Sequence, residues 1–130
     1  DLDRAVIRQW LDDYFQIFRR HHAGIRAWMQ AESIERDLRL VSDERMTTFL
    51  DHLTSWIQQA REHAGVPESE KSSRTRAVLL LTQLERLAYF WLIRHWEVDD
   101  VTVLDPLVDI WELNVLGKVT GLPGGARAAP

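Results

Sequence analysis

Apolar residues recur every three or four positions over most of the chain, which is the spacing of helices that bury one face. This pattern predicts five helices and no strand, and therefore an all-α fold of the bundle-like, antiparallel kind. The first three helices each carry one apolar stripe and a polar opposite face. They are expected at about residues 2–21, 23–40 and 42–64.

Local signals predict where these helices begin and end. Gly24 is expected to mark a bend between the first two helices, because glycine relaxes the backbone. Ser42 or Asp43 is expected to cap the third helix, and Gly65 is expected to end it. Residues 67–73 are polar, and we expect them to form a linker.

The last two helices are expected at about residues 74–97 and 102–117, and their apolar residues cover more than one face. The run over residues 77–96 is long and apolar enough to suggest a membrane span. Glu85 and Arg86 lie in its middle, and each charge is costly in lipid. A helix buried on more than one side therefore explains the pattern better than a membrane span.

The last helix carries its own boundary signals. Thr102 and Asp105 have the spacing of a capping box at its start, and Gly117 is expected to end it. We therefore expect one domain over residues 1–118, followed by a flexible tail rich in Gly, Pro and Ala over residues 119–130.

The two-faced helices predict a partner. One face of each can pack on the first three helices, but the chain has no further helix to cover the other face. The simplest solution is a second copy, so that the last two helices of both chains form a four-helix interface around a two-fold axis. We therefore predict a homodimer. The alternative is a monomeric bundle with the helix at about 74–97 in its centre.

Composition narrows the function classes. A chain of 130 residues fits a single domain, and its net charge of −4 argues against direct binding of nucleic acid, which normally needs a basic stripe. The chain has no cysteine, which excludes a disulfide framework, a thiolate nucleophile and Cys-ligated zinc. The cytoplasm is the default location for such a sequence.

The sequence shows no arrangement typical of an active site. The histidines are His21, His22, His52, His63 and His95. No two of them are four residues apart and no Glu-x-x-His occurs, so zincin and di-iron sites are not predicted. Phosphate-binding glycine loops and a nucleophile elbow are also missing from the sequence. We therefore expect no metal, no cofactor and no enzymatic activity.

Glu85 is the polar residue that allows two interpretations. In the first interpretation, Glu85 lies at the edge of the buried face and pairs with neighbours. In the second, Glu85 or Gln83 faces a cavity and anchors a ligand in an apolar pocket. The six tryptophans and their aromatic neighbours pose the same question, because aromatic residues at helical spacing fill cores more often than they line pockets.

Four segments together resemble a known family. They are WLDDYFQIFRRHHAGIRAWMQ (10–30), REHAG (61–65), LLTQLERLAYFWL (80–92) and VLDPLVDIWELNVLG (103–117). In order and register they resemble the C-terminal ligand-binding and dimerisation domain of TetR-family transcriptional regulators, of the actinobacterial group that represses an ethionamide-activating monooxygenase. The similarity extends over nearly the whole chain.

The resemblance implies a pocket among the first, third and fourth helices. One wall would be Leu11, Tyr14 and Phe18, a second Thr47, Leu50, Thr54 and Ile57, and a third Leu81, Leu84, Glu85, Ala88 and Tyr89, with Trp111 closing the end. A close relative of this kind carries amides where this chain has Leu81 and Leu84, so the pocket of this chain would be more apolar. A small lipophilic molecule is the implied ligand.

The resemblance also implies how such a protein works. The last two helices form the dimer interface of the family, and on them we expect Leu79, Arg86, Phe90, Ile93, Leu107, Ile110 and Asn114 to meet the partner. The family's N-terminal helix-turn-helix has no candidate in residues 1–130, so operator DNA would be bound only through an N-terminal domain absent from this chain. Ligand binding would release the DNA allosterically. The competing interpretations are a helical protein-interaction module with a filled core and a small helical enzyme.

Overall fold

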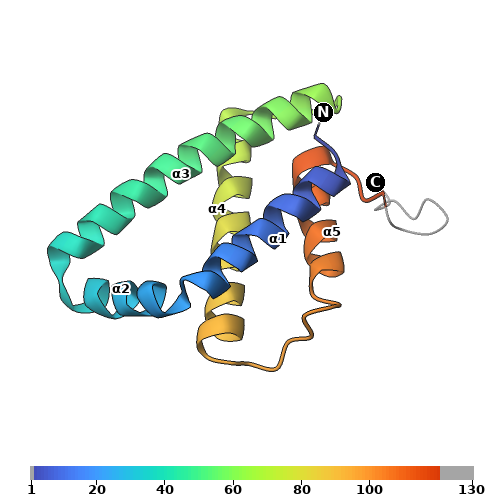
Figure 1. Ribbon diagram of the computed structural model, residues 1–130. Helices are drawn as coiled ribbons and strands as arrows, with labels where there is room; N and C mark the ends of the chain where they lie inside the picture. The colour runs from blue at the N-terminus through green and yellow to red at the C-terminus, as the bar shows by residue number, and fades with distance from the viewer. Residues whose placement is uncertain (1, 121–130) are drawn as a thin grey trace.

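The computed structural model describes residues 2–120, which form five α-helices and one π-helical turn and contain no strand (Figure 1). The elements are α1 (Arg4–Arg20), α2 (His22–Ile34), α3 (Arg36–His63), α4 (Glu70–Ala88), η1 (Tyr89–Ile93) and α5 (Leu104–Leu116). The predicted all-α fold with five helices is confirmed. Most of the tail expected at 119–130 lies outside the described residues.

The helices pack in two main pairs around one core. α3 makes its most extensive contacts with α4, and α1 crosses α5. Figure 1 shows α4 and α5 running in opposite directions, with α2 folded back beneath the first half of α3. Apolar side chains from α1, α3, α4 and α5 meet between these pairs. The largest fully buried apolar side chains are Ile7, Leu11, Phe15, Ile57, Leu84, Val108, Trp111 and Val115.

The break between α2 and α3 lies at Glu35, which corrects the boundary expected near residue 42. Glu35 has extended backbone (φ −97°, ψ 114°), and Ser42 and Asp43 lie inside α3 instead of capping it. The earlier bend is also at a different residue, because α1 ends at His21 and Gly24 lies within α2. Neither break carries a glycine or proline signal, so packing of α2 on α3 outweighs local propensity here.

Two glycines end helices as predicted. Gly65 and Gly117 have left-handed backbone, with φ of 79° and 73°. After α3, the Gly65 N–H donates to the Glu62 carbonyl at 3.1 Å and the Val66 N–H donates to the Arg61 carbonyl at 2.9 Å. These two bonds form a Schellman motif, which satisfies carbonyls at the end of the helix.

α4 begins earlier than its composition suggests. The expected linker over 67–73 is largely helical, because α4 starts at Glu70. The Ser69 hydroxyl accepts a hydrogen bond from the Ser72 N–H at 3.1 Å and so caps the first turn. A serine cap hidden within a polar run therefore extends the helix by one turn.

α4 ends earlier than expected, at Ala88 and not near residue 97. The chain continues as the π-helical turn η1, in which the Arg94 N–H donates to the Tyr89 carbonyl at 2.9 Å, five residues back. His95 then has left-handed backbone (φ 57°) and ends the helical path. Single π-turns are frequent at functional sites. This one contains three consecutive aromatic residues, Tyr89, Phe90 and Trp91, whose side chains point in different directions.

The turn before α5 is built around Asp99 and not around the predicted capping box. Its carboxylate accepts hydrogen bonds from the Val101 N–H at 3.0 Å and the Thr102 hydroxyl at 2.9 Å. These bonds hold the pKa of Asp99 below its usual value. The residue before α5 is Val103, whose side chain cannot cap, and Asp105 lies in the first helical turn.

A charged residue inside the core joins the two ends of the chain. Glu112 of α5 is fully buried, and Arg4 of α1 donates to its Oε2 at 2.8 Å. The Thr120 hydroxyl donates to Oε1 of Glu112 at 2.7 Å. Arg4 also lies 2.6 Å from Asp109 on the surface of α5. The buried carboxylate is therefore paired as well as hydrogen-bonded, which is the condition for a charge to be tolerated in a core.

Candidate ligand pocket

A cavity of about 820 Å³ lies between α1, α2, the first half of α3, α4 and η1. It is partly open to solvent, and its volume falls in the range of sites for small organic molecules. The lining residues are Tyr14, Phe18, Ile25, Trp28, Met29, Glu32, Ser33, Arg39, Ser42, Asp43, Arg45, Met46, Phe49, Leu81, Glu85, Arg86 and Tyr89.

Aromatic rings form the boundary between this cavity and the core. Trp111 is fully buried, and its ring centroid lies 5.2 Å from that of Trp10. Trp10 in turn stacks on Tyr14 at 6.0 Å, and Tyr14 lies 6.2 Å from Phe18. The aromatic residues therefore have both roles considered from the sequence: Trp111 belongs to the core, whereas Tyr14 and Phe18 face the cavity.

Polar contacts hold the far end of the cavity together, where α2 meets α3. The Trp28 indole N–H lies 3.1 Å from Oε2 of Glu32 and 2.6 Å from the hydroxyl of Ser42. That hydroxyl donates in turn to the Glu32 carboxylate. The three residues tie α2 to the first half of α3, so the wall formed by α2 depends on this small network.

Glu85 faces the cavity from α4. It is half-buried, and among the described residues its carboxylate forms no hydrogen bond and no salt bridge. Burial raises the pKa of Glu85, and the negative charge of Glu32 raises it further. Burial and the charge of Glu85 together raise the pKa of Tyr14 to about 12. The surroundings of Glu85 and Tyr14 therefore disfavour a negative charge on either side chain.

The structure brings together part of the pocket predicted from the sequence. Five of the predicted residues line the cavity, and they are Tyr14, Phe18, Leu81, Glu85 and Tyr89. The core contains Leu11, Thr54, Ile57, Leu84, Ala88 and Trp111. Leu50 packs on the core, and the exposed Thr47 donates its hydroxyl to the Asp43 carbonyl at 2.9 Å. The structure therefore places the cavity nearer to α2 than expected.

Sequence reasoning missed the wall contributed by α2 and the start of α3. Trp28, Met29 and Glu32 come from α2, and Met46 and Phe49 come from α3. The signal was present, because Trp28 and Met29 are large apolar residues on a short helix with little else to bury. α2 has no buried residue, and its apolar residues Ile25, Trp28 and Met29 line the cavity, where Ile25 also packs against the edge of the core.

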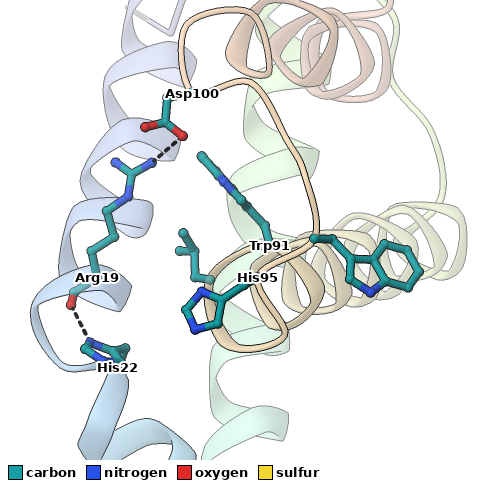
Figure 2. A pocket seen from close by; sticks show the side chains of 7 residues that line it. Arg19, His22, Trp91, His95 and Asp100 are labelled. Carbon is teal, nitrogen blue, oxygen red and sulfur yellow. Dashed lines mark hydrogen bonds and ion pairs between the residues drawn. The ribbon is translucent and has the colours of Figure 1, made fainter.

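A smaller hollow of about 410 Å³ lies at the other end of η1 (Figure 2). The Arg19 guanidinium lies 4.7 Å from the centroid of the Trp91 ring and 3.8 Å from the Asp100 carboxylate. The Arg19 carbonyl lies 3.1 Å from Nδ1 of His22. Figure 2 shows His95 beside these groups. The π-turn therefore sends Tyr89 into the larger cavity and Trp91 toward this smaller hollow.

Residues 2–120 contain no group of three or more His, Cys, Asp or Glu residues placed to hold a metal ion. None of the helices formed by residues 2–120 is long and apolar enough to cross a membrane.

A comparison with protein families matches residues 7–117 to the C-terminal domain of the transcriptional regulator EthR, a regulator of the TetR family. The chain belongs to this family. The match covers all of α2 to α5 and most of α1, and so confirms the resemblance drawn from the sequence. Comparisons with curated proteins and with solved structures found no match.

The EthR-type domain leaves all but one of the residues expected at its dimer interface at least partly exposed. Leu79 on α4 is 62% exposed and Ile110 on α5 is 40% exposed. Arg86 is exposed, and its guanidinium lies 5.1 Å from the ring centroid of Phe90. Phe90, Ile93 and Asn114 are partly buried. Leu107 is buried in the chain's own core and is the one member of that set with almost no exposed surface.

Removing the charge of Glu85 should stabilise the EthR-type domain. The Glu85→Gln variant should unfold at a slightly higher urea concentration at pH 7, because the ionised carboxylate is desolvated and repelled by Glu32. The gain should stay below about 1 kcal/mol, since the side chain remains partly in water. Urea unfolding curves of both proteins, followed by tryptophan fluorescence, measure the difference.

The sign of the pH dependence gives a second check on Glu85. The pKa is raised in the folded state, so the folded protein binds this proton more tightly than the unfolded chain. The advantage of Glu85→Gln should therefore shrink as the pH falls through the raised pKa toward the ordinary value of 4.5. If Glu85→Gln stabilised the domain by the same free energy at pH 7 and at pH 4.5, a raised pKa of Glu85 in the folded state would be contradicted.

Proposed function

We propose that this chain is the ligand-sensing and dimerisation domain of a TetR-type transcriptional repressor, with the 820 Å³ cavity as its ligand site. The observation that carries the proposal is this cavity, in a domain that belongs to the EthR-type family. The ligand is a small lipophilic molecule, and the protein acts in the cytoplasm. Operator DNA is bound by a separate DNA-binding domain of the regulator.

The position of the cavity supports an allosteric role. Its wall is shared by α1, α2, α3 and α4, so a bound molecule would contact every helix that precedes α5. A ligand changes the arrangement of these helices only by its different affinity for two arrangements. α1 is the helix nearest the DNA-binding domain in sequence order within such a regulator, so a shift of α1 is the most direct route to the DNA.

The exposed faces of α4 and α5 support the homodimer. Val78, Leu79, Ile110 and Leu113 are all exposed apolar residues on these two helices. Arg76 near the start of α4 donates to Oδ1 of Asn114 near the end of α5 at 2.9 Å, which links these two helices. A paired apolar surface of this kind is what an isologous two-fold interface requires. An α4 at the centre of a monomeric bundle would be covered on this side, whereas Leu79 is 62% exposed.

Thermal unfolding with a neutral lipophilic probe tests the ligand site. We expect 1-decanol to raise the midpoint of unfolding, because a ligand that binds only the folded state at about 100 times its Kd adds about 2.7 kcal/mol. For a domain of this size that is roughly 5–10 °C. Differential scanning calorimetry of the chain with increasing probe concentration measures the shift.

A filled pocket provides the matched control. Met29 lies on the cavity wall and is partly exposed, so Met29→Trp should occupy the space and abolish the shift. Leu40→Trp introduces the same side chain at an exposed position of α3 outside the cavity and should leave the shift intact. Equal shifts in both variants would place the probe elsewhere and contradict the proposed site.

A further inference from the structure

The cavity contains two half-buried carboxylates on different walls, Glu32 on α2 and Glu85 on α4. Glu85 lies within the field of Glu32, whose negative charge raises the pKa of Glu85. The Glu32 carboxylate accepts hydrogen bonds from Trp28 and Ser42, which are both neutral donors. Within residues 2–120, no salt bridge neutralises Glu32 or Glu85.

The arginines of the cavity wall do not reach these carboxylates. Arg39, Arg45 and Arg86 are exposed, so their charges remain largely in water. The Arg86 guanidinium lies over the Tyr89 ring at 5.4 Å, and the Arg45 guanidinium lies 6.0 Å from the Trp28 ring. These three arginines outnumber the one exposed carboxylate of the lining, that of Asp43, so the rim is net positive and hydrated, whereas the interior holds two carboxylates without a charged partner.

The remaining interior surface suits an organic cation. Tyr14, Phe18, Trp28 and Tyr89 all line the cavity, and the face of an aromatic ring attracts a cation within about 6 Å. Leu81 and Met46 add an apolar surface for the rest of the molecule. A cavity of ligand size with aromatic walls is an observation independent of the two carboxylates, and both point to the same kind of ligand.

We propose that the pocket selects lipophilic organic cations, such as amines or quaternary onium ions, and holds the positive charge between Glu32 and Glu85. The inference rests on the proposed function, since it names the ligand class of the same cavity. A cation there relieves the repulsion between the two carboxylates and offsets the free-energy cost of their desolvation, which a neutral ligand cannot do. The apolar part of the ligand lies against the aromatic wall.

Three aryl probes of different charge test the proposal. Tetraphenylphosphonium is a cation, tetraphenylborate is an anion of nearly the same size, and triphenylphosphine oxide is a smaller neutral relative. Quenching of tryptophan fluorescence, with Trp28 in the cavity wall, gives their dissociation constants with the intact chain. We expect tetraphenylphosphonium to bind at least tenfold more tightly than either of the others.

Charge-removing variants locate the cation. Glu85→Gln and Glu32→Gln should each weaken tetraphenylphosphonium binding about fivefold or more and leave the affinity for triphenylphosphine oxide unchanged. Glu44→Gln removes the same charge from an exposed position of α3 outside the cavity and should change neither affinity. Circular dichroism and thermal unfolding confirm that each variant is folded.

The outcomes separate this inference from the proposed function. Binding of 1-decanol or the phosphine oxide without any preference for the cation overturns the inference and leaves the ligand site in place. Tighter binding of tetraphenylborate overturns it as well, as does a cation preference that survives both Glu85→Gln and Glu32→Gln. Failure of every probe, 1-decanol included, overturns the inference and the proposed function together.

Discussion

Arg4→Ala should destabilise the domain by about 3 kcal/mol, because it leaves the fully buried Glu112 carboxylate without its charged partner. The two hydrogen bonds from Thr120 remain, but neither carries a positive charge. The hydrogen bond from Arg4 to Glu112 also joins α1 to α5 across 108 positions of sequence, so its loss loosens the contact between the two helices. Equilibrium unfolding in urea measures the loss as a lower midpoint at an unchanged slope.

Arg8 offers a matched control for Arg4. It lies one turn further along α1 and also pairs with a carboxylate of α5, that of Asp105. Both members of this pair are exposed, so Arg8→Ala should cost less than about 1 kcal/mol. Equal losses in the two variants would mean that burial of Glu112 contributes nothing. A combined Arg4→Met and Glu112→Leu variant should recover most of the stability, since a buried ion pair can be replaced by apolar residues.

The helices could be predicted from the sequence, because their apolar residues recur every three or four positions. The bounds expected for α1 and α5 lie close to the true ends of these helices. The ends of α3 and α5 were also predictable, since only glycine readily takes the left-handed backbone found at Gly65 and Gly117. These features depend on residues within one turn of each other.

The misplaced boundaries depend on contacts between distant residues. The break at Glu35 follows from the packing of α2 on α3, and Ser42, expected as a cap, instead bonds Trp28 across that contact. The π-turn at Tyr89 could not be predicted either, because its aromatic residues have no local preference for hydrogen bonds to the carbonyl five residues back. The buried role of Glu112 could not be predicted either, because its partner Arg4 lies at the other end of the chain.

The same distinction applies to the pocket. The predicted residues on α1 and α4 that line the cavity face inward from helices whose stripes were assigned correctly. The wall from α2 was missed because a helix with a free apolar face looks the same in sequence whether it covers a core or a cavity. α4 consequently has two functions in the proposal: Leu81 and Glu85 face the cavity, whereas Leu79 points out of the fold.

Leu79→Glu should convert the proposed dimer into monomers. Leu79 is the most exposed apolar residue of α4, and Ile110 and Leu113 extend the same kind of surface on α5. If the two-fold interface forms on these helices, each dimer must bury two added carboxylates near its axis, where they repel each other and lose water. We expect the dissociation constant to rise at least 100-fold, which corresponds to about 2.7 kcal/mol.

Sedimentation velocity at micromolar concentration distinguishes the two states. The unmodified chain should sediment as a dimer, and Leu79→Glu as a monomer with the same far-ultraviolet circular dichroism. Ile17→Glu places the same charge on an exposed apolar residue of α1, away from α4 and α5, and should remain dimeric. A chain that is monomeric before any substitution would remove the need for a partner on this face. The 62% exposure of Leu79 would then be an ordinary surface feature and not an uncovered interface.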